Sequence, residues 1–378
     1  MMRYATDDRP RGIGRVVVKI GSSVLTDRCG RILPDRIACL VEQVAASVRG
    51  RRQLLLVSSG AIACGMASLG LSRRPTSLAQ LQACAAIGQG ELMHRYTKAF
   101  GRHRLLTAQV LLTQEDLSSR RRFRNAKQTL LTLLHRRVVP VINENDTVSV
   151  EEITFGDNDR LAALVAVAVD AQLLVILSDV DGFLEHGKPL ARLETMALHH
   201  QVEAPGSGRQ TTKGGMASKL EAARIAGHSG IPMVIANGAR ASVLADVLAG
   251  RSVGTLCVPP RNRLTSRKWW IAFALRRPAG TVVIDPAAVR ALTEQRKSLP
   301  ACGVRRVSGR FDAGSFVTVA DGAGRALARG VSNFSSSELS RIRGMKSADA
   351  ARALGRPYAR AIIHRDSLVL TRELHHAA

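Results

Sequence analysis

The chain has 378 residues, of which 46% are hydrophobic and only 3% aromatic, and its formal net charge at pH 7 is +25. The hydrophobic content excludes a disordered chain, and the length is sufficient for two domains. Because aromatic rings are so few, the core must consist largely of Ala, Val, Leu and Ile side chains.

The cysteines and the N-terminus indicate the compartment. Six cysteines are scattered along the chain, and no two of them have the Cys-x-x-Cys spacing of a zinc site or a redox pair. Residues 1–14 are charged and lack the apolar segment of a signal peptide. No run approaches the roughly 20 apolar residues of a membrane span. We therefore expect reduced cysteines in a soluble, cytoplasmic protein.

The positive charge is unevenly distributed. Residues 261–378 hold 22 Lys and Arg against 8 Asp and Glu, whereas residues 1–260 hold 33 against 22. A strongly basic segment indicates either a surface that faces nucleic acid or an Arg-rich composition with solvated side chains. We favour the second interpretation for the N-terminal part, and both stay open for the C-terminal part.

Apolar strands alternate with helical patterns over the first two thirds of the chain. Strands are predicted at 15–20, 53–57, 105–112, 138–143, 173–177 and 232–236, and helices at 34–48, 78–100, 123–136, 161–169 and 216–229. This alternation predicts an α/β fold with a mostly parallel sheet covered by helices on both faces. Most of these strands end in Gly, Ser, Asn or Asp, and such strand ends are where ligands bind in α/β proteins.

The pattern changes after residue 258. Residues 259–278 are rich in Arg, Lys and Pro and contain Trp269-Trp270, which predicts a linker. Short strand-like pieces follow, separated by Gly and Asp turns, at 281–284, 304–307, 315–319, 326–331 and 361–364. They predict a small β-rich module with one or two helices.

Acids and amides gather after the strand at 138–143. Asn143 and Asp146 lie at its end, and Asp157, Asn158 and Asp159 precede the next helix. Carboxylates can hold Mg²⁺ or receive a substrate ammonium group, and amides suit a substrate carboxylate. Asx turns and helix caps explain one or two of these five residues, but not all of them.

Two lysines are candidate anion ligands. Lys19 lies among the apolar residues of the first strand, so its ammonium group must either reach solvent or meet an anion, such as a phosphate at the Gly21 turn. Lys219 lies in the first turn of a helix, after Gly214-Gly215, where the helix dipole disfavours a cation unless an anion offsets it. Lysines, Gly-rich turns and acids on one sheet edge indicate phosphoryl transfer driven by positioning and charge neutralisation.

Five segments in order resemble the glutamate 5-kinase family of amino acid kinases. They are Val-Lys-Ile-Gly-Ser-Ser-Val-Leu (18–25), Val-Ser-Ser-Gly-Ala-Ile-Ala (57–63), Val-Ile-Asn-Glu-Asn-Asp (141–146), Gly-Asp-Asn-Asp (156–159) and Gly-Gly-Met-x-x-Lys (214–219). The tail resembles a PUA module at Val331-Ser332, Leu354-Gly355 and His364-Arg365-Asp366. The resemblance implies an amino acid kinase domain at 14–258, a linker at 259–278 and a small PUA-like barrel at 279–378.

The resemblance also implies an activity and its partners. The reaction would be ATP-dependent phosphorylation of the L-glutamate γ-carboxylate, the first step of proline synthesis, with Mg²⁺ as cofactor and proline as feedback inhibitor. A homo-oligomer and weak RNA binding by the PUA-like module are further implications. No side chain is expected to bind the metal directly.

Residue roles follow from the same resemblance. Lys19 and Lys219 would neutralise charge on the transferred phosphoryl group, Asp157 would organise both lysines, and Asp159 would face the substrate amine. The glutamate-binding residues would be Ser59, Asp146 and Asn158, with Asn143 nearby. The ATP-binding residues would be Lys19, Ser178, Asp179, Lys213, Gly214, Gly215, Met216, Ala217, Ser218 and Lys219.

The chain departs from the family pattern at two places, and two other functions compete. Lys213 stands where the family usually has Thr, and Phe183 follows Gly182 where the family usually has Tyr.

An acetylglutamate or aspartate kinase is disfavoured by the segments at 141–146 and 156–159. An RNA-binding protein is the alternative of another class, with candidate contacts at Arg305, Arg306 and Arg310.

Overall fold

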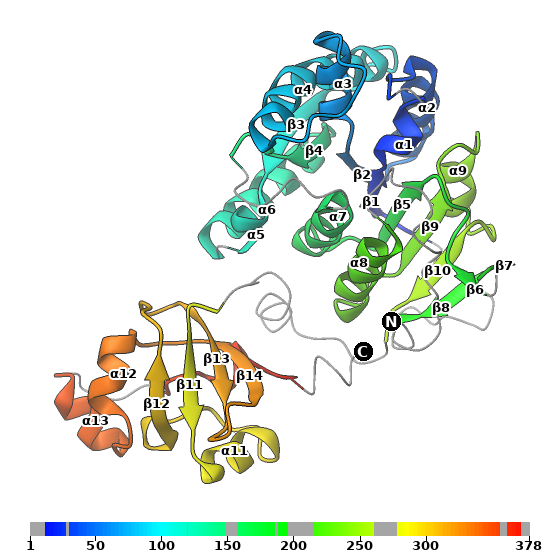
Figure 1. The fold of residues 1–378 in the computed structure, drawn as a ribbon. Helices are drawn as coiled ribbons and strands as arrows, with labels where there is room; N and C mark the ends of the chain where they lie inside the picture. Colours follow the sequence, from blue (N-terminus) through cyan, green and yellow to red (C-terminus); the bar gives the residue numbers. More distant parts are fainter. Residues whose placement is uncertain are drawn as a thin grey trace. The chain divides into compact units, whose positions relative to one another are not determined.

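The computed structural model describes residues 12–27, 30–118, 120–148, 157–185, 188–195, 215–260, 278–355 and 361–371. The chain separates into two compact units, Met1–Arg261 and Asn262–Ala378, each with its own sheet and its own hydrophobic core (Figure 1). The helices in the described ranges include none that is both long and apolar enough to cross a membrane. Cys39, Cys64, Cys84, Cys257 and Cys302 carry free thiols.

An eight-stranded sheet forms the centre of the first unit. In spatial order its strands are β3 (Thr107–Leu112), β4 (Val139–Glu144), β2 (Gln53–Ser58), β1 (Arg15–Ile20), β5 (Leu173–Ser178), β9 (Met233–Asn237), β10 (Thr255–Val258) and β8 (Arg192–Glu194). The strands from β3 to β9 are parallel, and β10 runs antiparallel to β9. The predicted mostly parallel sheet is confirmed. A separate two-stranded ribbon is formed by β6 (Leu184–Glu185) and β7 (Lys188–Pro189).

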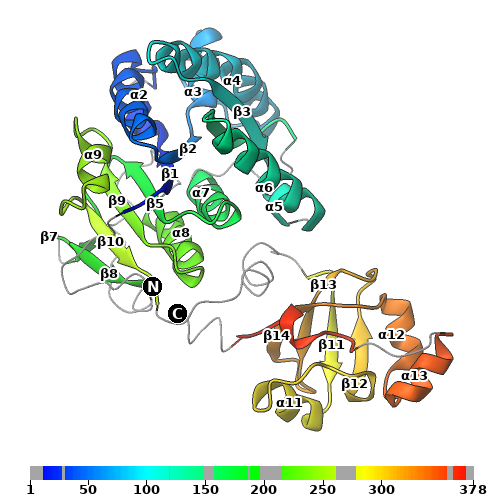
Figure 2. The same ribbon diagram turned by 180° about the vertical axis from the view of Figure 1, so that it is seen from behind.

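Helices cover both faces of this sheet (Figures 1 and 2). One face packs against α1 (Ser22–Leu25), α2 (Pro34–Arg49), α3 (Ala61–Ser68), α4 (Leu78–Gly101) and α9 (Val243–Leu248), and the other against α7 (Asp157–Ala168) and α8 (Met216–His228). Val16, Val18 and Ile20 of β1 belong to the core on the first face. Because side chains alternate along a strand, Lys19 points to the opposite face, toward α7.

The carboxyl ends of the parallel strands lie at one edge of the sheet. Ile20 at the end of β1 pairs with Ser58 of β2 and Leu177 of β5. The central strand β1 therefore has β2 on one side and β5 on the other. Ligands of α/β proteins bind at such a position, beyond the carboxyl ends of strands whose connections go in opposite directions. Gly60 has a φ of 110°, a conformation that favours glycine and that turns the chain from β2 into α3.

Two further described helices, α5 (Gln114–Ser118) and α6 (Arg120–His135), follow β3 and precede β4 in the sequence. They pack against each other, and α6 also packs on β4. Leu130 and Leu134 of α6 are buried, whereas most of its other side chains are polar and exposed. This division is typical of an amphipathic helix at the surface.

The second unit is the small β-rich module that the sequence predicts. Its five-stranded sheet has the order β12 (Val304–Ser308), β11 (Gly280–Ile284), β13 (Phe316–Ala320), β14 (Ala326–Val331) and β15 (Leu368–Leu370). The α-helices among the described residues of this unit are α11 (Pro286–Thr293), α12 (Ser336–Ile342) and α13 (Ser347–Ala353). A capping box between Ser335 and Glu338 begins α12, because each side chain bonds the backbone N–H of the other residue.

The predicted strand at 361–364 is wrong. Ile363 makes only a single bridge with Leu299, and the strand of this region is β15, which pairs with β14. Ile362 and Ile363 are nevertheless fully buried in the core of the unit. A buried segment without regular strand pairing has the same run of apolar residues as a short strand, so the apolar pattern alone does not distinguish the two.

Candidate active site

Three charged side chains meet beside the end of β1. The ammonium nitrogen of Lys19 lies 2.7 Å from Oδ1 of Asp159, and that of Lys219 lies 3.4 Å from Oδ2. The three residues come from β1, α7 and α8, and their exposed fractions are 7%, 0% and 6%. The Ser218 hydroxyl donates a further hydrogen bond of 2.7 Å to Asp159. Two lysines far apart in sequence are thus held by one buried carboxylate.

The two lysines keep Asp159 ionised. Burial alone raises the pKa of this carboxyl group, but Lys19, Lys219 and the hydrogen bonds to it outweigh burial, so the pKa lies below its ordinary value. Asp159 also lies in the first turn of α7, where the helix dipole favours a negative charge. The cluster is therefore one carboxylate between two ammonium groups at neutral pH.

This arrangement differs from the predicted division of roles. The sequence predicts that Asp157 organises the lysines and that Asp159 faces the substrate amine, whereas in the structure Asp159 binds both lysines. The side chain of Asp157 lies outside the described residues. The sequence alone does not give the rotation of the helix.

The cluster suits an anion with several oxygens. Lys19 and Lys219 bring two ammonium groups to one buried place, and ammonium groups bind phosphate oxygens through charge-assisted hydrogen bonds. Glycine at position 21 places no side chain beside them, whereas a Cβ atom there would lie 3.6 Å from the ammonium nitrogen of Lys19. A phosphate group therefore fits the charge of this place.

A second group of polar residues is connected by side-chain amides. Nδ2 of Asn158 donates to the hydroxyl of Ser59 at 2.8 Å and to Oδ1 of Asn143 at 3.1 Å. Nδ2 of Asn143 donates in turn to Oε1 of Gln89 at 2.9 Å. The structure thus joins three residues predicted to bind glutamate and adds Gln89, to which the sequence analysis gave no role.

Two atoms of this group are left without hydrogen bonds. Oδ1 of Asn158 and Nε2 of Gln89 are buried, and neither has a partner in the described part of the chain. An unpaired buried acceptor or donor costs about 1–3 kcal/mol, and such atoms are otherwise rare in proteins. Both atoms therefore indicate a place where a polar ligand completes the hydrogen bonding.

Asp146 has a different neighbour. Burial lowers the pKa of the Arg74 guanidinium, and the negative charge of Asp146 opposes this shift. Arg74 lies in the segment between α3 and α4 and is half-buried. Sequence reasoning missed it because it follows no strand and belongs to no recognisable pattern. The surrounding loop, Ser72 to Ser77, gave no sign that it reaches an acid at the end of β4.

The predicted nucleotide-binding residues are placed only in part. Ser178 is buried at the end of β5, and its hydroxyl donates to the exposed Asp179 carboxylate at 3.0 Å. Gly215 precedes α8, whose first residues are Met216, Ala217, Ser218 and Lys219. Lys213 and Gly214 lie outside the described residues. Phe183, where the chain departs from the family pattern, is fully buried.

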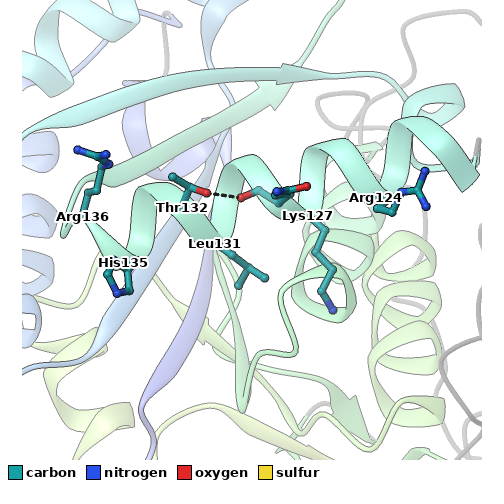
Figure 3. Close-up of a pocket in the computed structure, with 7 residues that line it drawn as sticks. Arg124, Lys127, Leu131, Thr132, His135 and Arg136 are labelled. Carbon is teal, nitrogen blue, oxygen red and sulfur yellow. Dashed lines mark hydrogen bonds between the residues drawn. The ribbon is translucent and has the colours of Figure 1, made fainter.

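A surface hollow of about 520 Å³ lies elsewhere, along α6 (Figure 3). Its lining residues belong to one helix and the residue after it, and they are Arg124, Lys127, Gln128, Leu131, Thr132, His135 and Arg136. Lys127 pairs with Asp170 at 2.7 Å. The hollow contains none of the residues at the carboxyl ends of the strands, so it is not part of the candidate active site.

Comparison with known proteins identifies the family. Residues 14–237 match the amino acid kinase family, and residues 280–354 match the PUA domain. Glutamate 5-kinase of Pelobacter propionicus is 46% identical over 367 residues, which are 95% of this chain and 98% of the relative. The chain belongs to the glutamate 5-kinase family. This membership confirms the resemblance seen in the sequence, including the tail.

Two further members of the glutamate 5-kinase family show the same extent of similarity. The enzyme of Streptomyces avermitilis is 47% identical over 364 residues, covering 94% of this chain and 96% of its own. That of Geobacter sulfurreducens is 46% identical over 365 residues, covering 95% and 98%. The similarity thus extends over both units of the chain and favours glutamate 5-kinases over the competing amino acid kinases.

Proposed function

We propose that the protein transfers the γ-phosphoryl group of ATP to the γ-carboxylate of L-glutamate, the first step of proline synthesis from glutamate. The observation that carries this proposal is the junction of two polar clusters at one sheet edge. Asp159 holds Lys19 and Lys219, and its neighbour Asn158 bonds Ser59 and Asn143. Phosphate oxygens suit the first cluster, and an amino acid suits the second.

The chemistry needs few catalytic groups. The attacking carboxylate of glutamate has an ordinary pKa of about 4.3, so it is already nucleophilic at neutral pH and needs no general base. In the transition state negative charge is spread over the phosphoryl oxygens and develops on the leaving oxygen, and the Lys19 and Lys219 ammonium groups are placed to stabilise it. Asp159 fixes the position of both lysines and prevents them from repelling each other.

We propose that Mg²⁺ binds to the phosphates of the nucleotide. Among the residues that the structure describes, no group of three or more His, Cys, Asp and Glu is arranged to hold a metal ion. Mg²⁺ commonly takes substrate phosphates and water as ligands, with few carboxylates. Removing Mg²⁺ with EDTA should therefore abolish turnover without lowering the Tm of the nucleotide-free protein. A fall in that Tm would contradict this proposal.

Asn158→Ala is expected mainly to raise the KM for glutamate. The variant loses an amide that bonds Ser59 and Asn143. Leaving buried hydrogen-bonding groups without a partner costs about 1–3 kcal/mol, which corresponds to a rise in the KM for glutamate of roughly 5- to 150-fold. The KM for ATP should stay within about twofold, because the lysine cluster is intact. Initial rates at varied glutamate and saturating Mg-ATP measure both constants.

The control for this variant is Asn333→Ala in the second unit. Nδ2 of Asn333 also donates one hydrogen bond, to the carbonyl of Ala361 at 2.8 Å. This control should leave both KM values unchanged. If Asn158→Ala raised the KM for ATP and left that for glutamate unchanged, the assignment of the amide cluster to glutamate would be wrong.

We propose further that proline inhibits the enzyme at the glutamate pocket. This proposal is supported by family membership and by the chemistry of proline, which shares the α-carboxylate and the amine of glutamate. The overlap would be near Asp146 and Asn158. Adding proline should raise the apparent KM for glutamate. Unchanged activity at every proline concentration would refute feedback inhibition here.

Two other proposals concern assembly and RNA. Leu69, Leu71, Leu78 and Ile87 are large apolar residues of the α3–α4 region with exposed fractions of 38–49%, which supports a homo-oligomer. Light scattering that gave only the 40.6 kDa of one chain would contradict it.

We also propose weak, salt-sensitive RNA binding by residues 279–378. Tight, sequence-selective binding in a filter assay would instead make RNA binding a primary function.

A further inference from the structure

We infer that Gln89 is a positioning residue that helps to select the ammonium group of the substrate, because it fixes the orientation of Asn143 and so supports the orientation of Asn158. This inference rests on the proposed function, because it concerns how the same pocket recognises glutamate. Gln89 does not follow a strand and is not one of the residues that the sequence marks for a site. It lies in the middle of α4 with an exposed fraction of 9%.

The backbone of α4 is held tightly at this position. A Cβ atom on Gly88 would lie 1.9 Å from the carbonyl oxygen of Ala61 and 2.2 Å from the amide nitrogen of Gly65, so α4 and α3 touch through their backbones. α3 begins directly after the turn that carries Ser59. The helix that carries Gln89 is therefore fixed relative to the amide cluster, and its side chain can act as a rigid reference.

The hydrogen bonds have one direction along the cluster. An amide side chain has one oxygen that accepts and one nitrogen that donates. Oε1 of Gln89 accepts from Nδ2 of Asn143, which turns Oδ1 of Asn143 toward Nδ2 of Asn158. Nδ2 of Asn158 also bonds the Ser59 hydroxyl and the carbonyl oxygen of Ser58, so the remaining oxygen of Asn158 has no donor among the described residues. The Ser58 carbonyl and, through Asn143, the acceptor of Gln89 therefore favour the same orientation of Asn158.

A free carbonyl oxygen selects between parts of the substrate. It accepts from an ammonium group and repels a carboxylate. Were Asn143 reversed, its nitrogen would face the nitrogen of Asn158, and Asn158 would either keep this unfavourable contact or reverse and lose its bond to the Ser58 carbonyl oxygen. The Gln89 acceptor therefore favours binding of an amine-bearing substrate over an otherwise identical dicarboxylate.

Stability alone does not account for a glutamine at this place. Nε2 of Gln89 is buried without a partner in the described ranges, and such a donor destabilises the fold by about 1–3 kcal/mol. Methionine has nearly the same volume and no polar atom that needs a partner. The retained amide is consistent with a role in recognition rather than in packing.

The test compares glutamate with glutarate, which has both carboxylates but no ammonium group. Dissociation constants are measured by isothermal titration calorimetry on the full chain, for the wild type and Gln89→Met. We expect the substitution to weaken glutamate binding about 10-fold or more, consistent with the loss of one buried hydrogen bond to an ionic group. Glutarate binding should change less than about threefold, because that ligand does not use the oxygen of Asn158.

Two further variants separate recognition from folding. Gln43→Met is the same substitution on α2, where Nε2 of Gln43 donates to Ala241 at 2.8 Å and Oε1 accepts from Leu244 at 3.0 Å. This control should keep the ratio of the two dissociation constants. Gln89→Glu retains the acceptor and adds a negative charge, which repels the doubly charged glutarate more than glutamate, so the preference for glutamate should be kept or increased.

Each outcome of the calorimetry has a distinct meaning. If the wild type prefers glutamate and Gln89→Met preserves that preference, the inference about Gln89 is overturned and the proposed function stands. If the wild type binds glutamate no better than glutarate, the proposed substrate and the inference both fail. A loss of preference in Gln89→Met, with the ratio kept in Gln43→Met and the preference for glutamate not reduced in Gln89→Glu, is the result that the structure predicts.

Discussion

Lys19→Ala is expected to lower kcat by about 100- to 1,000-fold, the size of effect seen when one group that stabilises transition-state charge is removed. The KM for glutamate should change little, because the amide cluster that bonds Ser59 does not include Lys19. Lys219→Ala should behave in the same way, since its ammonium group lies on the other oxygen of Asp159. Steady-state rates at saturating glutamate and Mg-ATP measure the effect.

The matched control is Lys127→Ala on α6. Lys127 pairs with Asp170 at the same 2.7 Å that separates Lys19 from Asp159. Lys127, however, lines the surface hollow along α6 rather than the active site (Figure 3). We expect a kcat within about twofold of the wild type, because exposed ion pairs contribute little to stability. If Lys19→Ala retained the wild-type kcat, the assignment of phosphoryl transfer to the lysine cluster would be wrong.

Asp159→Asn is expected to destabilise the nucleotide-free protein by about 3–5 kcal/mol, the cost of removing one partner from a buried ionic cluster. The substitution removes the carboxylate charge that Lys19 and Lys219 share. The pKa of Asp159 is lowered in the folded state, so its stabilisation is present above its unfolded-state pKa of about 3.9 and is lost as pH falls through the folded value. The difference between variant and wild type should therefore be large at pH 7 and shrink below about pH 4.

Chemical denaturation with and without nucleotide tests this prediction. ATP or ADP supplies negative charge to the two lysines, so saturating nucleotide should stabilise the variant by more than it stabilises the wild type. The control is Asp246→Asn, because Asp246 is also buried and pairs with two arginines, Arg240 and Arg251, but both are largely exposed. We expect a smaller loss of stability for this control and an unchanged kcat. Equal losses of stability for Asp159→Asn and Asp246→Asn would contradict the prediction that removing the carboxylate between the two lysines is the more destabilising change.

The sequence predicts the sheet edge well because short apolar strands followed by polar turns leave a direct signal. The strand that carries Lys19 is found at its predicted bounds, and the amides Asn143 and Asn158 come together. The parallel order follows from the alternation of strands and helices. Local patterns are sufficient for Lys19, Ser59 and Asn143, because each of them lies in a strand or directly after its end.

Residues that approach the site from helices and loops were not predictable in this way. Gln89 lies within a helix whose pattern is explained by core packing, and Arg74 lies in a loop without a recognisable pattern. Their roles depend on tertiary contacts, with Asn143 and with the charge of Asp146. The choice between Asp157 and Asp159 likewise depended on the rotation of α7 against β1, which spacing does not determine.

The most direct test of the proposed activity is hydroxylamine trapping of an acyl phosphate during Mg-ATP turnover. L-glutamate is the test substrate, and aspartate and N-acetylglutamate are the controls, because each has carboxylates but alters either the chain length or the amine. The proposed function predicts hydroxamate and ADP in equal amounts with glutamate, and little with either control. Hydroxamate formed with a control but not with glutamate, or none with any of the three, would contradict the assignment of the active site to glutamate phosphorylation.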